Sequence, residues 1–239
     1  LVMRRDLRNL SQLISPLILG VLYTLMLFRG GDVPAGQGQA PTEFYENFRM
    51  LLAYGSVGMA LFVGWMLLSR LAGMGFSSEG RHYWILKASP VRPRHLLAAK
   101  FLVAYLPTLA LSLLFLIVIS IMRQTPLAVA LYSLLAIVMS LAGMTGILLA
   151  FGALGANFNW DDPRKMSAGG MGCLGQVLTM LYLPVGAGVF LGPLWLVTAF
   201  GLPIFVGQLI GLGVGTLVTG AFAIVPLLLV QKRVERLGE

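Results

Sequence analysis

Six stretches of this chain are each apolar over about 20 residues, the length that an α-helix needs to cross the hydrocarbon core of a bilayer. They run over residues 11–28, 50–72, 101–122, 127–155, 172–196 and 203–230. Backbone N–H and C=O groups find no water inside a bilayer, so stretches of this length are expected to be helices. The sequence therefore predicts an all-α, polytopic membrane protein, with residues 1–239 forming one six-transmembrane-helix bundle.

The composition excludes a soluble globular domain. Only 11% of the 239 residues are charged and 58% are hydrophobic, whereas charged residues make up about 25% of a typical soluble domain. The single cysteine, Cys173, cannot form an internal disulfide. The chain begins with Leu1, and its first ten residues carry charges where a signal peptide has an apolar core, so we expect a fragment of a longer protein, such as a C-terminal half.

Lysine and arginine are distributed unevenly between the two sides of the predicted bundle. Of the 17 Lys and Arg residues, only Arg29, Arg49 and Arg123 fall on one side. Cytoplasmic loops carry the excess of these residues. We therefore expect a multi-pass protein of the cell membrane, with both termini, the 73–100 loop and the 156–171 loop in the cytoplasm. The net charge of +8 then reflects membrane orientation, and no nucleic-acid partner is expected because no basic stripe alternates with stacking aromatic residues.

The predicted spans from residue 101 onward contain no Asp, Glu, Lys, Arg or His. Ion-coupled transporters and proton pumps usually need such a group within the membrane. If the protein moves a solute, the energy is therefore expected to come from outside the membrane part.

Glycines recur at helix-packing spacing near the C-terminus. Gly207, Gly211 and Gly215 form two consecutive GxxxG steps, which let two helices approach closely. Two readings remain open: packing within the chain, or a dimer seam or sliding surface. In the preceding stretch, Pro184 and Pro193 predict that the span ends or kinks near Pro184 and that a short re-entrant or surface segment follows, with Trp195 as an interfacial anchor.

Known catalytic and nucleotide-binding patterns are missing. A P-loop lysine follows Gly and precedes Ser or Thr, whereas the four lysines follow Leu86, Ala99, Arg164 and Gln231. The sequence thus predicts no P-loop, no catalytic residue, no metal site and no cofactor. One acidic pair, Asp161 and Asp162, could hold Mg²⁺ for a diphosphate substrate. A helix-capping and salt-bridging loop is the other reading of this pair.

The loop at residues 77–100, SSEGRHYWILKASPVRPRHLLAAK, is the most informative stretch. It predicts a short cytoplasmic helix between the second and third spans, from about residue 79 to 89, with Ser77 and Ser78 before it and Pro90 and Pro93 after it. Ten helical residues are about 15 Å long, too short to cross a membrane. A helix of this kind lies on the membrane surface or docks in a groove of a partner.

This stretch resembles the cytoplasmic coupling element of ABC-2 type exporter permeases. The pattern has the form E-G-x-x-x-W-x-L-K-x-x-P and consists here of Glu79, Gly80, Trp84, Leu86, Lys87 and Pro90. The start, MRRDLRNLSQLISPLIL, and the loop NFNWDDPRKMSAGG are also similar to segments of that group.

The resemblance implies a transport permease that forms the substrate path and has no ATP-binding site of its own. A separate ABC ATPase subunit would drive it, and a second permease copy or half would complete it. Trp84 would anchor the short helix in a groove of the ATPase, and Arg81 and Lys87 would pair with acidic groups at its rim. The alternatives are a Mg-dependent membrane enzyme acting on a lipid or prenyl diphosphate, and a carrier or scaffold outside the ABC systems.

Overall fold

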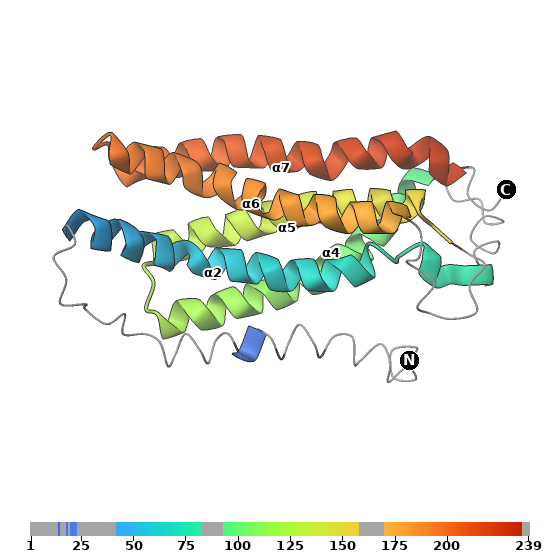
Figure 1. Cartoon of the computed structure of the whole chain (residues 1–239), viewed down its shortest axis with the longest axis horizontal. Coiled ribbons are helices and arrows are strands. Elements are labelled where there is room, and N and C mark those ends of the chain that lie inside the picture. The colour runs from blue at the N-terminus through green and yellow to red at the C-terminus, as the bar shows by residue number, and fades with distance from the viewer. Residues whose placement is uncertain are drawn as a thin grey trace.

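The computed structural model of the chain describes residues 14, 18, 20–22, 42–82, 93–157 and 170–235. Five long α-helices and one short 3-10 helix make up this part (Figure 1). They are listed in chain order as α2 (Thr42–Leu71), the 3-10 helix η2 (Ser77–His82), α4 (Pro93–Met122), α5 (Leu127–Leu154), α6 (Gly170–Ala199) and α7 (Ile204–Glu235). The all-α prediction is confirmed for the described residues.

Four helices are long and apolar enough to cross a membrane: Pro93–Met122, Leu127–Leu154, Gly170–Ala199 and Ile204–Val234. They correspond to the last four of the six predicted spans. In α2, the described apolar section is the shorter run Val57–Leu71. Most of the predicted span 11–28 lies outside the described residues, although residues 14, 18 and 20–22 are helical. The chain is thus a multi-pass membrane protein with four candidate spans among its described residues.

Helix α5 lies at the centre of the bundle and contacts α2, α4, α6 and α7. Its side chains Ile137, Leu141, Met144 and Leu148 are fully buried or nearly so. Figure 1 shows the long helices lying side by side along one axis. This placement explains why α5 is apolar all round and has no polar face, as a helix surrounded by others requires.

The outward faces of α4, α6 and α7 are also apolar. Val103 is 70% exposed, and Leu217 and Leu229 are each 76% exposed. Exposed apolar surface on this scale is unfavourable in water and matches the hydrocarbon of a bilayer. The outer faces of these helices are therefore the lipid-facing surface of the bundle.

The prediction for α6 is that its span ends or kinks near Pro184 and that a short re-entrant or surface segment follows; the end at Pro184 and the separate segment are wrong. The helix continues through Pro184 and Pro193 to Ala199, and in Figure 1 it bends along its length. No separate re-entrant segment lies between α6 and α7 in this described stretch. Proline is tolerated inside membrane helices because neighbouring helices and local adjustments satisfy the freed backbone groups.

Gly201 is the residue that stops α6. Its φ is +68°, in the left-handed region, and two hydrogen bonds close the turn: Gly201 N–H to Thr198 O at 3.1 Å and Leu202 N–H to Val197 O at 3.0 Å. This is a Schellman motif, for which glycine is the preferred residue. Trp195, at 66% exposed, lies one turn before the end of the helix.

Candidate functional site at the polar end of the bundle

The described cations gather at one end of the bundle. Five helix ends meet there, next to η2 (Figure 1, right). They are the C-terminal ends of α2, α5 and α7 and the N-terminal ends of α4 and α6. The described cationic residues of this end are Arg70, Arg81, Arg94, Lys100, Lys232 and Arg233. At the opposite end the described part of the chain carries Arg49 and Arg123. The cations of the described residues are therefore more numerous at one end of the bundle.

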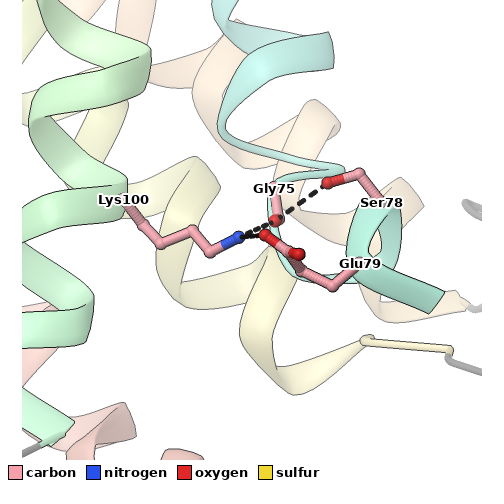
Figure 2. Close-up of polar contacts among 4 residues, drawn as sticks. All are labelled: Gly75, Ser78, Glu79 and Lys100. Carbon is pink, nitrogen blue, oxygen red and sulfur yellow. Dashed lines mark hydrogen bonds and ion pairs between the residues drawn. The ribbon is translucent and has the colours of Figure 1, made fainter. Parts of the chain in front are cut away.

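Lys100 is the centre of a junction between α4, η2 and the turn that follows α2 (Figure 2). Its Nζ donates to the Gly75 carbonyl at 2.7 Å and forms an ion pair with Glu79 Oε1. The ammonium also lies 5.6 Å from the ring centroid of the fully buried Phe76. The side chains of Lys100 and Glu79 are 15% and 35% exposed, so water screens this pair less than a surface pair.

Two serines hold η2 in place. Ser78 Oγ donates to the Gly75 carbonyl at 3.1 Å, the same carbonyl that Lys100 contacts. Ser77 is buried, and its Oγ accepts a hydrogen bond from the Asn157 backbone N–H at 3.1 Å. Because Asn157 follows the end of α5, η2 is tied both to α4 and to the segment that leaves the central helix.

A further contact joins α4 and α7 at this end. Arg94 Nε donates to Gln231 Oε1 at 3.2 Å. The first turn of α4 is thus held beside the last turns of α7. The described residues contain no group of three or more His, Cys, Asp or Glu side chains that could hold a metal ion. The described contacts join η2 to the N-terminal part of α4 and to the end of α5.

The structure places part of the predicted coupling motif in this junction. Glu79 pairs with Lys100, and Gly80 and Arg81 follow in η2. The remaining motif residues, Trp84, Leu86, Lys87 and Pro90, lie outside the described residues. Asp161 and Asp162 also lie outside them. The predicted helix from about residue 79 to 89 is therefore seen only in its first residues. There it is a 3-10 helix that begins at Ser77.

The predicted packing glycines lie on the face of α7 that meets the rest of the chain. A Cβ atom on Gly207 would lie 3.1 Å from the Pro193 carbonyl oxygen, and one on Gly215 would lie 2.3 Å from the Phe190 ring. Both neighbours belong to α6. In this geometry the glycines let α7 approach its own chain closely.

Gly211 lies at a contact as close as that of Gly215. A Cβ atom there would lie 2.3 Å from Tyr132 Oη and 2.8 Å from the Phe190 carbonyl oxygen. Tyr132 Oη donates to that carbonyl at 2.6 Å. Three helices, α5, α6 and α7, therefore meet at one buried hydrogen bond that only a glycine on α7 leaves room for.

Sequence reasoning missed the role of Lys100, which it counted only as one of the cytoplasmic cations. The available signal was its place as the last charged residue before an apolar run of α4. It also missed the buried hydroxyls of the interior, because it searched the spans for ionisable groups alone. Ser112, Ser140 and Tyr182 have buried hydroxyl oxygens without a hydrogen-bond partner.

Comparison with known protein families gives a match over nearly the whole chain. A family model described as “Putative ATP-binding cassette” matches residues 2–237. No curated protein and no solved structure matches the chain.

This match corrects the interpretation drawn from the 77–100 loop. The matching family is described as an ATP-binding cassette and is not an ABC-2 permease family. The prediction of an ABC-2 type exporter permease is therefore wrong, and so is the prediction that the chain has no ATP-binding site of its own. The resemblance rested on one short motif and on two further short segments, which are too little sequence to separate related families. The lysine argument excluded a P-loop and not other ways of binding a nucleotide.

The predicted partners are wrong for the same reason as the permease assignment. The resemblance to ABC-2 permeases implies a separate ABC ATPase subunit and a second permease copy or half, whereas the family description points to nucleotide binding by the chain itself. The match gives no better support to a Mg-dependent membrane enzyme or to a carrier or scaffold outside the ABC systems. The relation to ABC transporters holds, since the family model covers nearly the whole sequence, and the chain belongs to the “Putative ATP-binding cassette” family.

Proposed function

We propose that the chain works in ATP-dependent transport as a helical bundle embedded in a membrane, and that it binds the nucleotide itself. The observation that carries this proposal is the family match, because residues 2–237 include all four apolar helices as well as the polar junction. Nucleotide binding and membrane embedding are then properties of one continuous segment.

Charge restricts where a nucleotide would bind. The apolar runs 101–122, 127–154, 170–199 and 204–230 contain no Lys, Arg or His. Transfer of a triphosphate into such surroundings without paired cations is strongly unfavourable. A nucleotide site is therefore expected outside the apolar runs, where the cations of the chain lie.

The test uses the purified chain in lipid nanodiscs and a fluorescent ATP analogue with Mg²⁺. We expect saturable binding that excess ATP displaces and that an equal concentration of inorganic phosphate does not. Empty nanodiscs are the control. Binding no greater than that of empty nanodiscs would overturn the proposal.

We further propose that α2 and the stretch 11–28 also cross the membrane, which gives six spans. Helix α2 has 30 residues, or about 45 Å of helix, and it packs along α4 and α5. A Cβ atom on Gly20 would lie 2.3 Å from the Phe115 ring of α4, so the first helical stretch lies against the bundle. With six spans, both termini are on the side of the polar end, which we place in the cytoplasm of a cell-membrane protein.

Labelling of Cys173 tests this orientation. It is the single cysteine of the chain, it is free and exposed, and it lies in the first turn of α6 at the polar end. A membrane-impermeant maleimide is expected to label it in inverted vesicles and not in intact cells. The reciprocal control is Leu202→Cys in a Cys173→Ser background, since Leu202 is exposed at the opposite end of α6. Labelling of Cys173 in intact cells would contradict the orientation.

A further inference from the structure

Three exposed cations lie on the two helix ends that meet where α4 begins and α7 ends. Arg94, Lys232 and Arg233 are all exposed, and the hydrogen bond from Arg94 to Gln231 holds the two helix ends together. We call these three residues the Arg94 patch. Arg70 belongs to the same end of the bundle but lies on α2, which packs against α4, α5 and α6.

The Arg94 patch keeps a positive charge. Among the described residues whose side chains are placed, Glu79 is the one acid, and its carboxylate is paired with Lys100. Glu235, the last residue of α7, is the acidic residue nearest in sequence. Even with Glu235 counted against the three cations, two net positive charges remain, so the patch favours an anion over a neutral or cationic group.

The patch also lies at the depth of lipid headgroups. The apolar run of α7 ends at Val230, directly before Gln231 and Lys232. The apolar run of α4 begins at Phe101, and Arg94 lies about 10 Å before it along the helix. From that position the long side chain of Arg94 can reach the headgroup layer.

Further along both helices, toward the membrane centre, exposed side chains are apolar. On α4 these include Val103 and Leu106, and on α7 they include Leu228 and Leu229, which are 59% and 76% exposed. A molecule seated at the patch would thus meet cations at one end and apolar surface along its length. That combination fits an amphipathic anion and not a free one.

We propose that the Arg94 patch binds the phosphate headgroup of an anionic phospholipid, whose acyl chains lie along the exposed faces of α4 and α7. Arginine and lysine form charge-assisted hydrogen bonds with phosphate oxygens, and arginine can do so with two N–H groups at once. Gln231 orients Arg94, so it acts as a positioning residue.

The experiment measures lipid binding to the purified chain by native mass spectrometry, with phosphatidylglycerol and phosphatidylcholine of identical acyl chains. We expect phosphatidylglycerol to bind more tightly, and the preference to fall about fivefold for each cation removed. The variants are Arg94→Gln and the pair Lys232→Gln with Arg233→Gln. Arg70→Gln is the matched control, because it removes one exposed cation from the same end of the bundle and is expected to leave the preference unchanged.

Two further arms separate the lipid from other anions. Soluble glycerol phosphate is expected to compete only weakly, because it lacks the acyl chains, and ATP is expected not to displace the lipid. Equal binding of the two lipids, an equal loss in Arg70→Gln, or displacement by glycerol phosphate or ATP at concentrations near that of the lipid would each overturn the proposal. Gln231→Leu should reduce the preference by less than Arg94→Gln does.

Discussion

Substitution of Gly146 by alanine is expected to cause a large loss of stability, because this glycine brings the backbones of α5 and α7 into contact. A Cβ atom at Gly146 would lie 2.5 Å from the Ala223 carbonyl oxygen and 2.7 Å from its Cα, with the Phe222 carbonyl oxygen at 2.8 Å. All three atoms belong to the backbone and cannot rotate away, so the two helices would have to separate.

The expected cost is about 3 kcal/mol, the upper part of the range for overpacked interiors. Separation of α5 from α7 affects the centre of the molecule, since α5 also contacts α2, α4 and α6. The measurement is the free energy of unfolding in mixed detergent micelles, together with the temperature at which half of the protein is lost from the monodisperse fraction.

Gly213→Ala is the matched control for this prediction. Gly213 lies in α7, and a Cβ atom there would have no neighbour within 4 Å. The same methyl group should then be neutral or stabilise the protein by up to about 1 kcal/mol, because alanine favours the helix over glycine. If Gly146→Ala and Gly213→Ala unfolded at the same temperature, the close contact between α5 and α7 would be refuted.

The packing glycines show how much of the helix packing can be predicted from the sequence. The spacing rule selected Gly207, Gly211 and Gly215, which lie on one helix face. It did not select Gly146, whose effect depends on which backbone lies opposite. Helix periodicity gives the face of a residue, but the neighbour across that face is determined by how five helices pack together.

The ends of the helices show a similar limit. The apolar runs of α4, α5, α6 and α7 could be read from the sequence because a bilayer requires about 20 apolar residues in a row. The continuity of α6 through its two prolines could not, since Pro184 and Pro193 are stronger stop signals in the sequence than one glycine. Inside the bundle Pro184 and Pro193 are accommodated, whereas Gly201 takes a backbone conformation that stops the helix.

The contacts of the polar junction could not be predicted from the sequence. The motif pointed to Glu79 as part of an interface with another protein, but its described partner is Lys100, 21 residues later in the same chain. Sequence spacing gave no indication of this pair, because Glu79 lies in η2 and Lys100 in α4, and spacing does not predict how two separate elements pack. The family description then changed the function assigned to the region.

Lys100→Met is the second substitution with a large expected effect. Methionine keeps much of the apolar stem against Phe76 and removes the ammonium that contacts Glu79 and Gly75. We expect a loss of about 2 kcal/mol in the free energy of unfolding, less than the 3–5 kcal/mol for a fully buried pair. The reduction follows from exposure, since Glu79 is 35% exposed and its carboxylate can turn to water. Ser78 still donates to the Gly75 carbonyl.

A double-mutant cycle separates the ion pair from the other contacts of Lys100. Glu79→Gln alone is expected to cost about 1 kcal/mol, and adding it to Lys100→Met should cost almost nothing more, a coupling energy of about 1 kcal/mol. Arg70→Met, an exposed cation at the same end, is the control and should change stability by less than about 0.5 kcal/mol. Because Ser77 also bonds to Asn157, loss of the pair should release η2 from α4 while its contact with the end of α5 remains. Fully additive single substitutions would show that Lys100 stabilises the junction through Gly75 and Phe76 and not through Glu79.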